Sequence, residues 1–352
     1  MARFILGHEH VFNNEIVPDA FLGSRIVQNF VRNNYNAVTR GLSRIVPFLD
    51  NDVFDRYATF IENGECTVAE NVERCVNDAK SAFMSDEVEV NVLMMDMSQM
   101  GAGDVALSLT KQFVELRNLK KSGYPINIFL ACDPRNLTEF WYIANMFPED
   151  IAGVKIYPLL GYFPYDIRLD DVYKWCIVNN KPVISHCSHY NAVHYRGSDI
   201  DELLKDAEFP IEHKHGSKKK KASNFCNPKG FAILNKRFPK LKLVIAHLGG
   251  YDEVRKYMKG KSSWTSEILD LCKNHKNVYT DISYTMSYTD LIPCISDIMS
   301  VSALRRKVLY GTDFYMNDIA LKKRSFHTPI YEKLELTDWL TLISNWSHLY
   351  DD

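Results

Sequence analysis

The sequence lacks the long hydrophobic run, the charge bias and the leader segment that would direct a protein to a membrane. No stretch of about 18 consecutive apolar residues occurs, so nothing is expected to span a bilayer. The first residues hold no apolar segment of the kind found in secretory signal peptides. The formal net charge is −2, which gives no overall attraction to nucleic acid or lipid surfaces. We therefore expect a cytoplasmic protein that acts on a small-molecule substrate and binds neither nucleic acid nor membrane.

The cysteines and glycines lack the arrangements that mark two other classes of protein. The eight cysteines are scattered and form no C-x-x-C pair, which fits reduced thiols better than a disulfide framework. No G-x-G-x-x-G follows any predicted strand, so the fingerprint of a dinucleotide-binding open sheet is missing.

Short apolar strands alternate with amphipathic helices along the chain. We predict strands at 3–11, 88–95, 126–131, 153–157, 182–186, 241–247, 278–282 and 307–313. Predicted helices between and after them lie at 67–84, 106–121, 137–146, 170–178, 228–237, 263–275, 290–299 and 334–346. Strands separated by helical segments indicate βαβ units and a parallel sheet. Eight such units predict a (β/α)8 TIM barrel, with an open doubly wound sheet as the alternative.

The 352 residues are expected to form one barrel domain, 1–352, with two long insertions. Segments 12–64 and 187–228 both follow strands, so both should lie on the C-terminal catalytic face and cap the site. The alternative is that each segment is an insertion without a role at the site, or forms a contact in a homo-oligomer. Side chains in these segments that could contact a substrate are Arg40, Arg44, His189, His194 and Arg196.

His8 and His10 end the first predicted strand. Residues i and i+2 of a strand project from the same face, so both imidazoles should point together. Two adjacent imidazoles are half of a metal site, although a lone His-x-His also fits a polar loop.

Other polar residues lie where later strands end, the edge at which barrel enzymes carry their chemistry. These are Lys155, His186, His247 and Asp313. In a closed barrel the eighth strand neighbours the first, so Asp313 can reach a metal held by the first-strand histidines. Imidazole and carboxylate suit zinc, iron or manganese. Asp313 could also take a proton from a metal-activated water, and His247 is a further ligand or a residue that positions water or substrate.

These segments resemble the amidohydrolase superfamily of metal-dependent hydrolases, in particular its amidohydrolase-related branch, which includes the aminocarboxymuconate-semialdehyde decarboxylase-like enzymes. The matching segments are, in order, 7–10, 153–158, 183–186, 238–250, 277–281 and 309–313. The resemblance implies a single divalent metal, most often Zn2+, with Mn2+ or Fe2+ as alternatives. The implied ligands are His8, His10, His186 and Asp313. It also implies that Asp313 is the catalytic base and that His247 assists the water or the substrate.

Lys155 lies on the strand where two-metal members of the superfamily carry a bridging carboxylated lysine. The single-metal branch often has an unmodified lysine there, so we favour a contact with a substrate carboxylate or a core ion pair over a binuclear site. The sequence departs from the family at Leu6, where many relatives have the acid of Asp-x-His-x-His. That acid is the usual partner that orients the histidines.

The predicted function is hydrolysis of an ester, lactone or amide of a small molecule by a metal-activated water. The alternatives are a metal-dependent non-oxidative decarboxylase and a non-catalytic binding protein. Asp281, at the end of the seventh strand, either touches substrate or makes a structural hydrogen bond. The lysines at 218–221, after His213 and His215, are interpreted as a solvated loop tip rather than a phosphate or nucleic-acid site, because no aromatic residues interleave with them.

Overall fold

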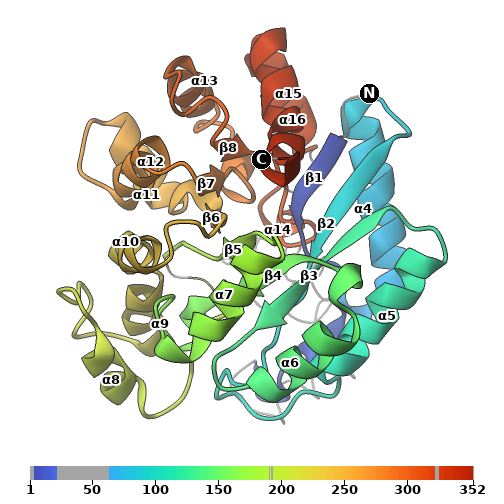
Figure 1. The fold of residues 1–352 in the computed structure, drawn as a ribbon. Coiled ribbons are helices and arrows are strands. Elements are labelled where there is room, and N and C mark those ends of the chain that lie inside the picture. Colours follow the sequence, from blue (N-terminus) through green and yellow to red (C-terminus); the bar gives the residue numbers. More distant parts are fainter. Residues whose placement is uncertain (1–3, 22–62, 190, 192, 322–324, 352) are drawn as a thin grey trace, which may run out of the picture.

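Eight parallel strands lie side by side in chain order, with helices around them (Figure 1). The computed structural model describes residues 4–21, 63–189, 191, 193–321 and 325–351. The strands are β1 (Phe4–Glu9), β2 (Val88–Leu93), β3 (Ile126–Cys132), β4 (Ile151–Ile156), β5 (Val183–Ser185), β6 (Leu243–Ile245), β7 (Val278–Asp281) and β8 (Val308–Leu309).

Backbone hydrogen bonds join the last strand to the first. The Gly7 N–H donates to the Tyr310 carbonyl (3.0 Å), and the Asp313 N–H donates to the His8 carbonyl (2.8 Å). The predicted (β/α)8 barrel is therefore confirmed, and the end of β1 lies against the residues that follow β8.

Helices cover the outside of the barrel. They are α4 (Val68–Phe83), α5 (Leu109–Lys121), α6 (Leu137–Met146), α7 (Asp170–Val178), α10 (Pro228–Arg237), α11 (Tyr251–Met258), α12 (Trp264–Asn274), α13 (Pro293–Ser300), α14 (Asp318–Leu321), α15 (His327–Lys333) and α16 (Leu336–Asp351). The predicted start of α4 is confirmed, because Thr67 and Glu70 form a capping box with each other's backbone N–H. None of the described helices has the length and hydropathy of a membrane span.

The insertion after β5 contains two short helices, α8 (Ile200–Leu203) and α9 (Lys218–Ala222). The expected loop tip at 218–221 is thus wrong, since these lysines form most of α9. Lys221 pairs with Asp201 (2.6 Å), and the Lys218 ammonium donates to the Arg196 carbonyl (2.7 Å), which holds the segment against the insertion. Of the other predicted cap, 12–64, only 12–21 and 63–64 lie within the described residues.

An apolar cluster fills the inside of the barrel, and Trp346 and Leu349 of α16 complete it. Its members are Ile5, Leu93, Phe129, Ile184, Val244, Ala246, Tyr279, Leu309, Trp346 and Leu349. Trp346 also donates its indole N–H to the Tyr310 carbonyl (2.8 Å). Its ring lies so close to Gly7 that a Cβ there would be 1.5 Å from the indole nitrogen. Glycine at position 7 is therefore required by the close approach of α16.

The register of β1 shifts between Leu6 and Glu9 relative to β2, which marks a bulge. Ile5 belongs to the cluster inside the barrel and Leu6 to the cluster between barrel and helices. After the bulge, His8 and His10 meet inside while Glu9 contacts the segment after β8. Leu6 thus faces away from the imidazoles. A carboxylate that orients His8 and His10 must therefore come from another part of the chain.

Candidate metal centre

Three side chains from the two ends of the chain converge at the C-terminal mouth of the barrel. Ligand atoms of His8, His10 and Asp313 all lie within 4.8 Å of one another. Asp313 Oδ1 is 3.5 Å from His10 Nε2 and 4.0 Å from His8 Nε2. His8 lies in β1 and His10 directly after it, while the segment after β8 supplies the carboxylate, so the predicted approach of Asp313 to the two histidines is seen.

Hydrogen bonds fix which nitrogen of each imidazole faces this cluster. His10 Nδ1 lies 3.0 Å from the Leu93 carbonyl oxygen, to which only a protonated nitrogen can donate. His8 Nδ1 lies 2.8 Å from Asp281 Oδ2 and donates to that carboxylate. Both Nε2 atoms therefore present lone pairs toward Asp313, as a metal ligand must.

Asp313 gives the test of whether a cation fits here. Its Oδ1 atom is buried and has no hydrogen-bond donor within the described part of the chain. A buried carboxylate oxygen facing two imidazole lone pairs is costly unless a cation or proton lies among them. The donor set, two nitrogens and one oxygen, is one that Zn2+, Mn2+ and Fe2+ accept. The residues present therefore fit a divalent metal.

Lys155 of β4 is the fourth group in this cluster. Its Nζ lies 3.2 Å from His8 Nε2, and its side chain is buried. Burial lowers the pKa of Lys155 to about 8 and raises the pKa of Asp313 to about 7, while their mutual attraction opposes both shifts. A metal and the Lys155 proton would compete for the same lone pair of His8.

Burial also keeps the imidazoles neutral. Desolvation, followed by the Lys155 charge, lowers the pKa of His8 to about 3 and that of His10 well below its usual value. Burial likewise lowers the pKa of His247 to about 4. Neutral imidazole is the form that coordinates metals, so these residues are in the required protonation state at neutral pH.

His247 and His186 form a hydrogen-bonded pair beside the cluster. The His247 ring centroid is 4.8 Å from that of His8, and His247 Nε2 is 3.1 Å from His186 Nδ1. His186 also accepts from or donates to Ser188 Oγ (3.0 Å) and stacks on Tyr157, with centroids 4.2 Å apart. His186 is thus outside the group of three whose ligand atoms converge, and its role as a ligand stays a prediction.

A scan against family models matches the amidohydrolase model to residues 150–338, which is more than half of the chain. The chain belongs to the amidohydrolase family. The matched part of this amidohydrolase carries Lys155, His186, His247 and Asp313, whereas His8 and His10 precede it.

Solved structures agree in fold at low identity. A probable 2-pyrone-4,6-dicarboxylic acid hydrolase from Acinetobacter baumannii is similar with a TM-score of 0.56 and 12% identity, covering 99% of this chain and 100% of that one. An amidohydrolase II structure is similar with a TM-score of 0.52 and 14% identity, again covering 99% of this chain and 100% of that one. No curated protein matches this amidohydrolase.

Two acids that the sequence did not assign to the site hold its parts in place. The Asp281 carboxylate accepts hydrogen bonds from His8 Nδ1, from the backbone N–H of His247 (2.9 Å) and from the Ser283 hydroxyl. Burial alone would raise the pKa of Asp281, but its interactions with His8 outweigh burial and hold it well below the usual range. Asp281 thus orients His8 from β7, and its predicted structural hydrogen bond to the next loop is confirmed, because Ser283 donates to it.

Glu9 is the second such acid. Its carboxylate is fully buried and accepts from the Thr312 N–H (2.8 Å), the Thr312 hydroxyl and the Phe314 N–H (2.8 Å). These donors flank Asp313, which has the left-handed φ of +62°. Alternation along β1 could have indicated that Glu9 points away from the histidines, but nothing local named its partners.

Three of the side chains predicted to contact a substrate interact with other residues of the protein. His189 pairs with Glu253 (3.4 Å) and stacks on Trp264, and Arg196 donates to the Phe21 carbonyl. His194 Nδ1 lies 3.1 Å from the Asn191 carbonyl oxygen. Arg40 and Arg44 lie outside the described residues.

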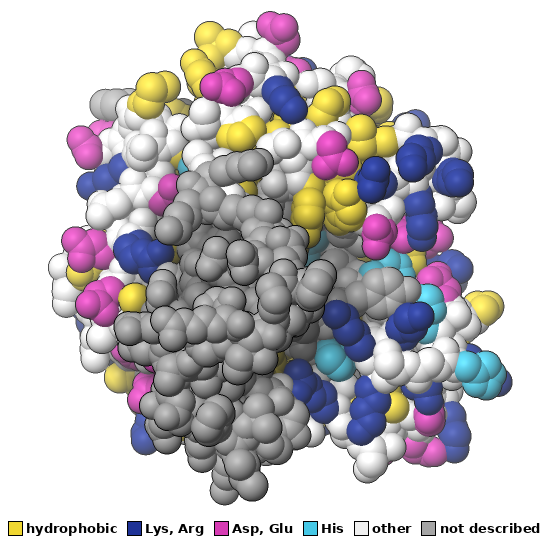
Figure 2. All heavy atoms as spheres, turned by 180° about the vertical axis from the view of Figure 1, so that it is seen from behind, with side chains coloured by type: hydrophobic (Ala, Val, Ile, Leu, Met, Phe, Trp, Pro, Cys, Tyr) yellow, Lys and Arg dark blue, Asp and Glu magenta, His cyan; other side chains and the backbone are white. Residues whose placement is uncertain are grey.

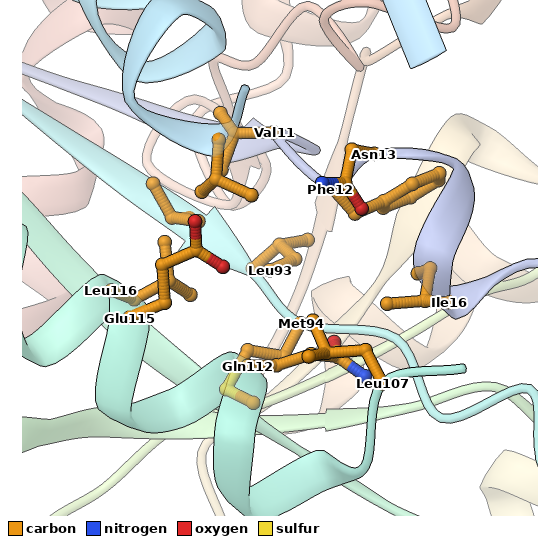
Figure 3. A pocket seen from close by; sticks show the side chains of 12 residues that line it. Val11, Phe12, Asn13, Ile16, Leu93, Met94, Leu107, Gln112, Glu115 and Leu116 are labelled. Carbon is orange, nitrogen blue, oxygen red and sulfur yellow. The ribbon is translucent and has the colours of Figure 1, made fainter. Parts of the chain in front are cut away.

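An apolar pocket lies between the segment after β1, strand β2 and helices α4 and α5 (Figure 3). Val11, Ile16, Leu93 and Leu116 line it, and the Glu115 carboxylate points into it. Burial raises the pKa of Glu115. Most of its apolar lining residues belong to the packing between barrel and helices.

Proposed function

We propose that this amidohydrolase is a cytosolic metal-dependent hydrolase of small molecules that opens an ester, lactone or amide bond. The observation that carries the proposal is the buried Asp313 oxygen facing the Nε2 lone pairs of His8 and His10. A divalent ion held there, most often Zn2+ in such a donor set, would supply Lewis-acid activation of water near neutral pH. The structure that is similar at TM-score 0.56 is a probable lactone hydrolase, so lactones are the first substrates to assay.

Three side chains of the protein would carry out proton transfer, substrate orientation and charge stabilisation. The second oxygen of Asp313 takes the proton of the attacking water. His247, held by Ser283 and paired with His186, is in position to orient the water or the substrate carbonyl. The Lys155 ammonium attracts the negative charge that develops on the substrate oxygen.

A metal-dependent decarboxylase is the second candidate. It is favoured by one observation, the buried Lys155 amine beside His8, which could bind a substrate carboxylate. Such an enzyme would release carbon dioxide and place a proton on the carbon left behind.

Turnover assays on purified protein distinguish the two. The chain is loaded with Zn2+, Mn2+ or Fe2+ and incubated with panels of lactones, esters, amides and unsaturated carboxylic acids. The proposal expects water addition without carbon dioxide, abolished in Asp313→Asn and in His10→Ala. Carbon dioxide release without net water addition supports the decarboxylase, and no turnover on either panel with any metal overturns both.

A further inference from the structure

A second cavity lies at the junction of α11 with the insertion that follows β5, outside the metal cluster. Its volume is about 440 Å³. Among the described residues, those that line it are all ionisable: His189, Glu212, His213, Asp252, Glu253, Arg255, Lys256, Lys259 and Lys261. Ligand pockets are usually lined by apolar side chains, so this lining is suited to a small, highly charged ligand rather than an apolar one.

Two of the three acids in the wall already have donors from the protein. Glu253 is buried and accepts from the Lys256 ammonium (2.5 Å) and the Trp264 N–H (2.7 Å), and it pairs with His189. Glu212 accepts from the Asn227 amide (2.7 Å) and the indole of Trp264 (3.3 Å). These carboxylates are therefore occupied with holding the wall together and are less available to a cation.

Lys256 is paired with Glu253, but among the described residues the other three basic side chains of the wall have no close ion pair. Arg255 donates to the Tyr251 hydroxyl (2.9 Å) and approaches Asp290 only at 3.8 Å, with both side chains about half exposed. The ammonium groups of Lys259 and Lys261 make no hydrogen bond or ion pair within the described residues. These two lysines follow α11, on either side of Gly260, whose φ is +66°.

The insertion brings a further positive charge near this wall. Burial, followed by neighbouring charges that include Lys220 of α9 and Lys256 of α11, lowers the pKa of His213, which lines the cavity. Figure 2 shows Lys and Arg side chains, with histidines among them, gathered on this side of the molecule.

We propose that this cavity binds a phosphate-bearing small molecule. Lysine is a point-charge phosphate ligand, and several such charges with imidazole N–H donors around one cavity suit a tetrahedral polyanion. The rival explanation is that Lys256 and Lys259 only offset the negative C-terminal end of the α11 dipole, which requires no ligand. This inference does not depend on the proposed hydrolase activity.

The test is calorimetric titration of the metal-free full-length protein with inorganic phosphate and with pyrophosphate at low salt. We expect saturable binding that falls at least about tenfold in the double variant Lys259→Gln/Lys261→Gln, because charge-assisted hydrogen bonds are lost. The matched control is Lys236→Gln/Lys240→Gln, which removes the same charge from exposed lysines that do not line the cavity. The control should bind as the wild type does.

Three outcomes would overturn the proposal. Absence of saturable binding supports the helix-dipole explanation, and equal weakening in both double variants shows a general charge effect. Succinate is titrated in the same way as a dianion without phosphorus. Equal affinity for succinate and pyrophosphate shows that the cavity does not select phosphate. Thermal unfolding of each variant, recorded in the same buffer, confirms that the compared proteins are folded.

Discussion

The carboxylate of Glu9 accepts hydrogen bonds from both the backbone N–H and the hydroxyl of Thr312, the residue directly before Asp313. It also accepts from the Phe314 N–H on the other side (2.8 Å). The acid between the two metal-facing histidines therefore fixes the position of the third proposed ligand.

Glu9→Gln tests this relationship. Glutamine has nearly the same shape, but one carboxylate oxygen is replaced by an NH2 group that cannot accept a hydrogen bond. At least one of the three hydrogen bonds is therefore lost. We expect affinity for Zn2+ to fall about 10- to 100-fold, the usual cost of removing a partner that orients a metal ligand. Competition with a chromogenic chelator measures it. Glu115→Gln, which changes a carboxylate with no role at the site, serves as the control, and equal affinities in wild type and Glu9→Gln would contradict the prediction.

Asp281→Asn tests the orientation of His8. The substitution keeps the size of the side chain but removes the charge that accepts from His8 Nδ1 at 2.8 Å. Zn2+ affinity should again fall about 10- to 100-fold. Asp290→Asn, at an exposed ion pair with Arg255, is the matched control. A variant that binds Zn2+ as tightly as the wild type would show that the Asp281 carboxylate is not needed to orient His8.

The (β/α)8 fold could be predicted because its signals are local. The alternation of apolar strands and capped helices lies within short windows, as at Thr67 and Glu70, where one capping box starts α4. The strand-end residues His8, His10 and Asp313 could be predicted because closure of an eight-stranded barrel brings its first and last strands together.

The supporting residues could not be predicted, because their partners are distant in the chain. Glu9 and Thr312 are separated by 303 positions, and His8 and Asp281 by 273. Side-chain rotation decides whether His186 faces His8 or pairs with His247, and a strand-end position does not determine it. The close approach of Trp346 to Gly7 likewise joins opposite ends of the sequence.

Gly7→Ala should destabilise the barrel, because the new Cβ would lie 1.5 Å from the indole nitrogen of Trp346. Overpacking of this kind typically costs about 1–3 kcal/mol, with larger losses where the backbone must move. Urea unfolding followed by tryptophan fluorescence measures the change in unfolding free energy. Gly7 itself has no left-handed φ, so the loss is expected from the contact alone. Unchanged unfolding free energy in Gly7→Ala would show that Trp346 can move aside without cost.

Glu253 makes stability depend on pH in the acid range. Burial raises its pKa, but hydrogen bonds from His189, Lys256 and the Trp264 N–H outweigh burial and lower it to about 2. A folded-state pKa below the unfolded value contributes stability that is present above the unfolded pKa, about 4.3. That contribution is lost as the pH falls from there toward 2.

Comparison of the wild type with Glu253→Gln measures this contribution. Urea unfolding at intervals between pH 7 and pH 3 should show a constant difference in unfolding free energy above about pH 5.5, shrinking as the pH falls below the unfolded pKa. A difference that is independent of pH throughout would contradict the prediction.

The location of the metal is the central claim. The most direct measurement is anomalous diffraction at the zinc edge from crystals of the wild type grown with Zn2+. We expect one peak per chain within bonding distance of His8 Nε2, His10 Nε2 and an Asp313 oxygen, absent in crystals of His10→Ala. A peak elsewhere, or no peak at full occupancy of Zn2+ in solution, would contradict it.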